Sequence, residues 1–114
     1  MSTTPNLGLA QMPQNLTQPS VPYNDAMQVL DALAQLTPLD KDLNVPPVTV
    51  ATDVGKTWLV ASAPTGAWAG QSGRIALCVG AGLWRFIAPK RGWRAFVLDE
   101  NAGYWYNGTV WVLG

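Results

Sequence analysis

The spacing of apolar residues changes near the middle of the chain and divides it into two kinds of structure. Within residues 24–36 the large apolar side chains recur at the spacing of one helix face. From Thr57 onward, apolar residues come in short runs separated by glycine and other turn residues, which is the pattern of β-strands. The sequence therefore predicts one amphipathic helix followed by a mainly β domain.

The predicted helix, residues 24–36, has a signal at each end. Asn24 can cap its N-terminus by accepting a hydrogen bond from a backbone N–H of the first turn, and Pro38 disfavours a helical conformation at Thr37. A helix of about 13 residues is marginal alone, so its apolar face must pack on something. Packing on its own chain and neighbours is favoured over a coiled coil of several copies, because the pattern is shorter than two heptads.

The segment before the helix, residues 1–23, is predicted to be an extended arm. It holds four prolines and no charged residue, so it has too little apolar surface to fold alone. Either a neighbouring subunit covers its apolar side chains, or the segment is an uncovered tail. We expect an assembly interface along the arm and the helix. Its residues are Leu7, Leu9, Met12, Leu16, Met27, Leu30, Leu33 and Leu36.

Two further regions follow the helix. Residues 37–56 are a proline-containing connector with a short strand at 48–51 and a tight turn after it. Residues 57–114 form a domain that contains all six tryptophans. The fold class is mainly β: a small antiparallel β-meander or barrel-like domain, preceded by an extended N-terminal arm and one short α-helix. The predicted strands are 57–61, 75–79, 83–87, 93–98, 104–106 and 109–113.

The tryptophans must supply most of the core of so small a domain. Each can bury roughly 150–250 Å². Strand alternation predicts that Trp105 points inward while Tyr104 and Tyr106 point to the other face. Trp68 lies in a glycine-rich loop, where a core position and an exposed position both remain open. The tryptophans assigned to the core are Trp58, Trp84, Trp93 and Trp111.

The residue types exclude most catalytic chemistry. The chain has no histidine and one cysteine, which removes Ser-His and Cys-His pairs, histidine metal ligands and an internal disulfide. Asp99 and Glu100 are neighbours, and neighbouring side chains tend to point apart, which suits paired acid–base catalysis poorly. We expect a non-enzymatic protein with no catalytic residues, cofactor or metal. Cys78, within an apolar run, is expected to be a small buried side chain.

The charge and hydropathy patterns limit the partners. Seven basic and seven acidic residues give no net charge, which argues against a nucleic-acid partner bound through phosphates. No apolar stretch approaches the roughly 18 residues of a membrane span, so none is expected. The cluster of Lys90, Arg91 and Arg94 is either a solvated loop or a contact for an acidic partner.

Aromatic residues are the one candidate for a ligand site. Aromatic rings can stack on the apolar faces of sugars, while nearby amides bind the hydroxyls. This alternative function is a carbohydrate-binding module that contacts a host surface polysaccharide. Its candidate residues are Trp68, Tyr104, Tyr106 and Asn107.

Several short motifs together resemble a known family, DUF2793, which occurs in phages, prophages and gene transfer agents. The resemblance covers almost the entire chain. One difference is that the stretch before the helix lacks the histidines and lysine that family members often carry. The motifs are Asn6-Leu-Gly-Leu9, Asn24-Asp-Ala26, Leu30-Asp-Ala-Leu33, Leu39-Asp-Lys-Asp-Leu43 with Pro46-Pro47, Thr65-Gly-Ala-Trp-Ala-Gly70 with Gly73, Trp84-Arg-Phe-Ile-Ala-Pro89, Gly92-Trp93, and Asn107-Gly108 with Trp111.

This resemblance implies a structural protein of the virion, assembled in the bacterial cytoplasm. It implies a part of a head spike or tail fibre, with capsid, tail or fibre proteins as partners. Because the sequence ends at Gly114 without a receptor-binding domain, we expect an attachment or base piece involved in host attachment. We expect a homo-oligomer, and a trimer if the protein serves a fibre.

Overall fold

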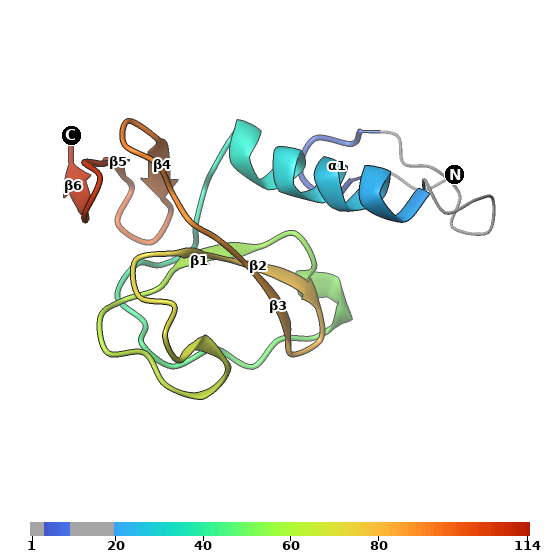
Figure 1. Cartoon of the computed structure of the whole chain (residues 1–114), viewed down its shortest axis with the longest axis horizontal. Helices are drawn as coiled ribbons and strands as arrows, with labels where there is room; N and C mark the ends of the chain where they lie inside the picture. Colours follow the sequence, from blue (N-terminus) through green and yellow to red (C-terminus); the bar gives the residue numbers. More distant parts are fainter. Residues whose placement is uncertain (1–3, 10–19) are drawn as a thin grey trace.

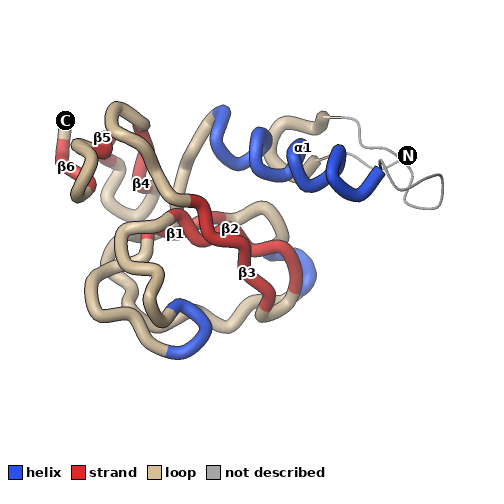
Figure 2. Tube along the Cα trace, in the orientation of Figure 1, coloured by secondary structure: helices blue, strands red, loops and turns tan. Residues whose placement is uncertain are grey.

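One helix precedes two small antiparallel sheets in the computed structural model, which describes residues 4–9 and 20–114 (Figures 1 and 2). Each sheet is a meander, ordered β1–β2–β3 and β4–β5–β6. The mainly β prediction is confirmed, but there are two sheets and neither closes into a barrel. The elements are α1 (Ser20–Ala34), η1 (Ala51–Asp53), β1 (Thr57–Leu59), η2 (Gly66–Trp68), β2 (Ile75–Gly80), β3 (Leu83–Ile87), β4 (Arg94–Val97), β5 (Ala102–Tyr106) and β6 (Trp111–Leu113).

The helix α1 begins and ends earlier than its pattern predicts. It begins before Asn24, which therefore lies inside the helix, so the capping prediction is wrong. Pro22 falls in the first turn, where its missing N–H has no helical acceptor to lose. The helix ends at Ala34, and the backbone of Leu36 already accepts a hydrogen bond from the N–H of Phe96 in β4 (3.0 Å). Pairing with the sheet thus replaces the last predicted helical turn.

The described part of the N-terminal arm, residues 4–9, is a closed turn rather than an extended strand. The N–H of Thr4 donates to the carbonyl of Leu9 at 2.8 Å. The turn is hydrogen-bonded to α1 and to the loop before β1 of the same chain, and within it Thr4 is buried while residues 5–8 are exposed. Met12 and Leu16 lie outside the described residues.

The predicted connector contains a segment that joins the two sheets. This bridging segment, residues 36–44, bonds to the edge of β4 through Leu36 and to the edge of β1 through Asp40, whose carbonyl accepts the N–H of Leu59 at 2.9 Å. Backbone hydrogen bonding therefore runs from one sheet to the other. The strand predicted at 48–51 is wrong, because residues 48–50 have no regular structure and η1 follows them.

The first sheet is covered on both faces, so β1 is buried throughout and β2 is buried over its first four residues. One face meets the second sheet in a shared cluster. The residues of that cluster are Leu36, Leu59, Ile75, Ala95 and Val97. The opposite face carries a second cluster, whose residues are Trp58, Val60, Trp68, Ala76 and Cys78.

The glycine-rich loop folds over the outer face of the first sheet and places Trp68 in the second cluster. The Trp68 side chain is 0% exposed. Its ring meets that of Trp84 edge-on, with centroids 5.2 Å apart, and Trp84 meets Trp58 in the same way at 5.4 Å. The core interpretation of Trp68 is therefore the one that the structure shows, and Cys78 is buried as predicted.

The described residues cover the second sheet on one face only, and β4 alternates between exposed and buried residues. Tyr104 pairs with the buried Ala95, while Trp105 pairs with the exposed Arg94. Paired residues share a face, so Tyr104 packs against the core and Trp105 lies on the outer face. The predicted orientation of these aromatics is wrong, because the register pairs Tyr104 with a buried residue of β4 and Trp105 with an exposed one. The predicted core residues Trp93 and Trp111 are half-buried against the shared cluster.

Candidate functional site

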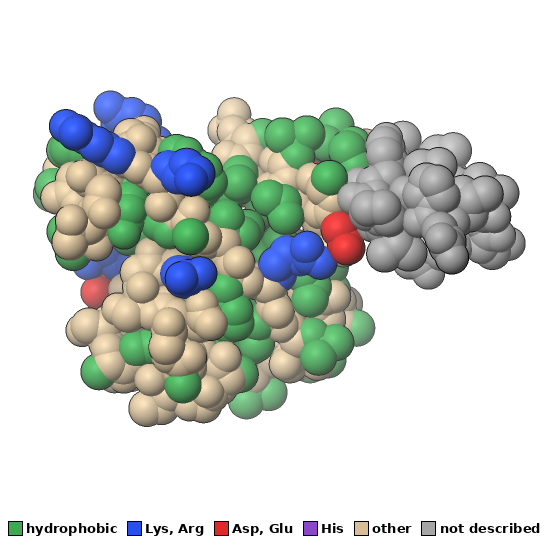
Figure 3. Space-filling view, in the orientation of Figure 1, with side chains coloured by type: hydrophobic (Ala, Val, Ile, Leu, Met, Phe, Trp, Pro, Cys, Tyr) green, Lys and Arg blue, Asp and Glu red, His purple; other side chains and the backbone are tan. Residues whose placement is uncertain are grey.

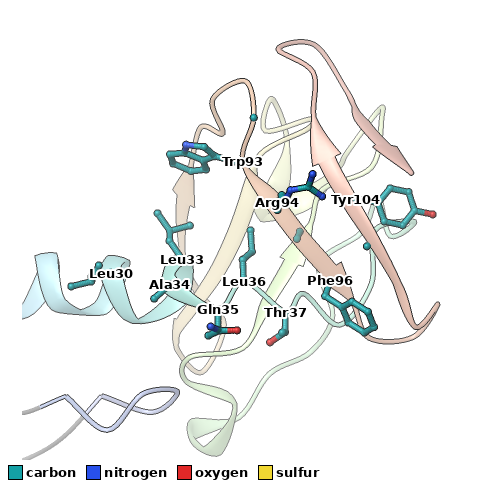
Figure 4. Close-up of a pocket in the computed structure, with 13 residues that line it drawn as sticks. Leu30, Leu33, Ala34, Gln35, Leu36, Thr37, Trp93, Arg94, Phe96 and Tyr104 are labelled. Carbon is teal, nitrogen blue, oxygen red and sulfur yellow. The ribbon is translucent and has the colours of Figure 1, made fainter. Parts of the chain in front are cut away.

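A groove of about 740 Å³ lies between the end of α1 and the second sheet (Figure 4). The last turns of α1 form one wall, and β4 with the middle of β5 forms the other. Two of its large apolar side chains are open to water, since Leu30 is 53% and Phe96 is 42% exposed. The groove is therefore a mainly apolar surface on which a protein could dock. Its principal side chains are Leu30, Leu33, Trp93, Arg94, Phe96 and Tyr104.

The structure separates the residues of the predicted assembly interface into an inner and an outer group. Leu36 is buried in the shared cluster and Leu33 packs against it, so both serve the chain's own core. Leu30 and Leu7, which is 40% exposed, face solvent. The remaining described residues, Leu9 and Met27, are half-buried. The exposed members, and Leu33 where it lines the groove, are accessible to another protein in the folded chain.

A buried carboxylate holds the N-terminal turn, and the apolar pattern did not reveal it. Asp31 of α1 is 1% exposed and accepts the backbone N–H groups of Asn6 (2.9 Å) and Leu7 (2.6 Å). The side-chain amide of Asn6 donates to the carbonyl of Gly55 at 3.0 Å. Pro5 lies so close to Gly55 that an added Cβ would sit 2.3 Å from its Cγ. The sequence signal for this contact was an acidic residue, Asp31, on the side of the helix that is covered in the structure.

Four carboxylates gather around one lysine where the bridging segment meets the β4–β5 turn. We call Asp40, Asp42, Asp99, Glu100 and Lys41 the acidic end. The Lys41 Nζ lies 3.1 Å from an oxygen of Asp42 and 3.5 Å from one of Glu100. The pKa of Asp99 is raised above its usual value, first by partial loss of hydration and then by the nearby charges of Asp40 and Glu100. When ionised, the acidic end therefore repels itself.

Tyr104 connects the acidic end to the groove. Its hydroxyl donates a hydrogen bond to Glu100, and the Nζ of Lys41 lies 5.1 Å from the centre of its ring. The pKa of Tyr104 is raised, chiefly because the hydrogen bond to Glu100 favours the protonated hydroxyl. Both its polar atom and its ring are thus engaged within the chain.

Three cations gather at the other end of the second sheet. We call Lys90, Arg91 and Arg94 the basic end. The first two lie in the exposed turn before β4, and Arg94 is the first residue of that strand. Arg94 Nη1 donates to the carbonyl of Gly114 at 3.1 Å. Within the described residues none of the three forms an ion pair, and Figure 3 shows Lys and Arg side chains over this part of the surface.

The four candidate sugar-binding residues do not form a platform. Trp68 is buried. The Tyr106 hydroxyl donates to the carbonyl of Thr109 at 3.2 Å, and its ring leans on Trp111 with centroids 5.2 Å apart. The side-chain oxygen of Asn107 accepts the N–H of Thr109 at 2.8 Å and fixes the turn before β6. Tyr104 is hydrogen-bonded to Glu100, so all four side chains make contacts that stabilise the fold of this chain.

The carboxylates and the single thiol of the described residues do not form a metal site. Over residues 4–9 and 20–114 there is no group of three or more Cys, Asp or Glu that could hold a metal ion. The Sγ of the buried Cys78 lies 3.2 Å from the carbonyl of Gly80, to which it donates. In the same residues no helix has both the length and the apolar character of a membrane span.

Comparison with known proteins assigns the chain to one family. None of the curated proteins matches it. The sequence pattern of a family described as "Protein of unknown function (DUF2793)" matches residues 23–112, which include nearly all of α1, the bridging segment and both sheets. The match spans well over half of the sequence, and the chain belongs to the DUF2793 family.

Proposed function

We propose that this protein is a non-enzymatic structural component of a phage or gene-transfer-agent virion. It attaches a head spike or tail fibre, or forms the base of one. The observation that carries this proposal is the groove between α1 and the second sheet, where the apolar side chains of Leu30 and Phe96 are open to water beside a well-packed core. Apolar surface of this kind on a small, firmly held domain is typical of a protein-docking site.

The geometry also indicates how the docking surface is kept in place. The N-terminal turn is hydrogen-bonded to Asp31 on another side of α1, and Arg85 of β3 pairs with Asp25 of α1 at 3.2 Å. The helix is thus fixed to the body of the domain before any partner binds. A preformed surface loses little conformational entropy on binding. The partners of this role are capsid, tail or fibre proteins.

The carbohydrate-binding alternative receives no specific support. Its four candidate side chains are buried or engaged in hydrogen bonds within the chain.

The experiment compares two single substitutions in particles assembled in the host. Leu30→Asp places a charge in the groove at a position that is 53% exposed, so it should leave the fold intact and desolvate a carboxylate on docking. Val48→Asp makes the same chemical change at a position that is 98% exposed and outside the groove. We expect Leu30→Asp to reduce incorporation into purified particles at least about tenfold, since ~1.4 kcal/mol of lost affinity suffices.

The readout is the amount of protein per particle, measured by quantitative immunoblot and by electron microscopy of the appendage. The thermal unfolding temperatures of both variants should match that of the wild type. Absence of the wild-type protein from purified particles would overturn the proposal. Equal incorporation of Leu30→Asp and Val48→Asp would remove the groove from it.

A further inference from the structure

The two charged clusters lie at opposite ends of the same strand. The basic end contains the first residue of β4, Arg94, and the acidic end contains Asp99 and Glu100 in the turn that follows the strand. A four-residue strand is about 13 Å long. This exceeds the Debye length of about 8 Å at physiological salt, so the two ends hardly attract each other within one chain.

The charges at the two ends are equal and opposite. Three cations stand at one end, and four carboxylates with one ammonium stand at the other. Elsewhere in the described residues, Lys56 pairs with Asp53 at 2.7 Å and Arg85 with Asp25 at 3.2 Å. Besides the two ends, Arg74 and Asp31 are the charged residues without an ion-pair partner among the described residues. Most of the unpaired charge therefore lies at the two ends, although the chain as a whole is neutral.

The acidic end is unfavourable within the isolated chain. Ionised Asp99 faces the charges of Asp40, Asp42 and Glu100, and a single lysine is shared between two of these carboxylates. A cationic surface brought against this end would relieve the repulsion. The basic end of another copy carries cations that have no carboxylate partner among the described residues.

We propose that copies of this chain associate with the basic end of one against the acidic end of the next. A second copy is the occupant that matches the observed charges, because it satisfies both ends with one kind of contact. An acidic peptide or a nucleic acid would neutralise only the basic end. Association of this kind closes either as a two-fold pair or as a ring.

This inference rests on the proposed function for its biological setting, because a spike or fibre base is built from repeated copies. Its test does not depend on that setting, since self-association is measured on the pure protein. Failure of association leaves the incorporation experiment on Leu30 unaffected, and failure of incorporation leaves the charge pairing intact.

The experiment reverses the charge at each end and then at both. Lys90→Glu/Arg91→Glu reverses the exposed turn of the basic end, and Asp42→Lys/Asp99→Lys reverses exposed positions of the acidic end. The combined variant carries all four substitutions and has complementary ends again, with their signs exchanged. The control is Arg74→Glu, an exposed cation outside both ends. Sedimentation over a concentration series gives Kd and assembly mass, and tryptophan fluorescence verifies the fold.

We expect the wild type to associate at about 0.05 M salt and to dissociate as salt approaches about 0.5 M, because the contact is electrostatic. Reversal of either end should raise Kd at least about tenfold. The combined variant has net charges of −1 (two Glu and Arg94) and +1 (Lys41 and two new Lys against Asp40 and Glu100) at its ends, so it should bind more tightly than either single-end variant. Arg74→Glu should have the wild-type Kd. A wild type that stays monomeric at low salt would overturn the proposal, as would a combined variant no tighter than the single-end variants.

Discussion

The two sheets have the same topology but differ in how many of their faces are buried. Each is a three-stranded antiparallel meander, but the first is covered on both faces by the two core clusters, whereas the second is covered on one face. The fully buried Ile75 and Cys78 belong to the first sheet, and the fully buried Trp68 of η2 packs on it. The second carries the groove and both charged ends. The same small architecture thus provides stability in one region and accessible surface in the other.

The difference follows from what each sheet packs against. The bridging segment and the glycine-rich loop cover the outer face of β1 and β2 with Leu39, Leu43 and Trp68. Among residues 4–9 and 20–114 no comparable segment covers the outer face of β4, where Phe96 is 42% exposed. Substitutions in the first sheet should therefore reduce stability, and substitutions on the second should mainly affect association.

The largest expected effect separates the two sheets through their aromatic residues. Trp68→Ala should destabilise the protein by about 3–5 kcal/mol, because it removes a fully buried ring and leaves a cavity beside Trp84. Phe96→Ala, on the second sheet, should cost less than about 1 kcal/mol, because its ring is already partly in water. Urea unfolding followed by tryptophan fluorescence measures both, and similar losses would contradict the comparison.

The next effect concerns the N-terminal turn that covers one end of the first sheet. Asp31→Ala should destabilise the protein by about 1–3 kcal/mol, because two backbone N–H groups lose their acceptor. Hydrogen exchange should show loss of protection at Asn6 and Leu7. Unchanged protection of these two amides would show that Asp31 does not hold the turn.

A smaller effect tests the packing of the N-terminal turn through Gly55, which Pro5 of that turn contacts. Gly55 and Gly82 both have positive φ, at 96° and 68°, so alanine at either position should cost about 1–2 kcal/mol in backbone strain. Only at Gly55 would the new methyl group collide with Pro5. Gly55→Ala should therefore lower the unfolding temperature more than Gly82→Ala, and the excess measures the docking of the turn. Equal shifts would mean that the turn moves away at no cost.

The smallest effects are pH-dependent and differ in sign between the two regions. The hydrogen bond from Lys56 lowers the pKa of Asp53, so its stabilisation is present above the ordinary value of 3.8 and is lost as pH falls through the lowered pKa. The pKa of Asp99 is raised, so its stabilisation is present below 3.8 and is lost as pH rises through the raised pKa.

At neutral pH and low salt, Asp53→Asn should therefore lower the unfolding temperature and Asp99→Asn should raise it slightly. Both shifts should disappear in acid, where the wild-type carboxyls are protonated. Scanning calorimetry across this pH range measures them. Shifts of the same sign for both variants would contradict the assignment of Asp99 to a self-repelling cluster.

The sequence predicted the elements well and their surroundings less well. Turn glycines and short apolar runs located the strands because those signals are local. The alternation along β5 was as expected, but which face points inward depended on the register with β4, where Tyr104 pairs with the buried Ala95. The end of α1 depended on a hydrogen bond from Phe96, far along the chain. Local patterns do not contain such information.

Local sequence patterns also predicted the candidate site only in part. Leu30 was recognised from its helical spacing and is exposed, but Leu36, in the same pattern, is buried in the chain's own core. The two charged ends are separate in sequence from one another, and the acidic end combines the bridging segment with the β4–β5 turn. Only the folded chain brings Asp40 beside Asp99.

Hydrogen exchange on the pure protein, below and above the concentration at which it associates, tests most directly the claim that the two sheets have separate roles. We predict that association slows exchange in the turn at residues 89–93 and in the turn at 98–101, while the glycine-rich loop at 62–73 exchanges as before. Protection confined to that loop, or no change at any concentration, would contradict this division between the sheets.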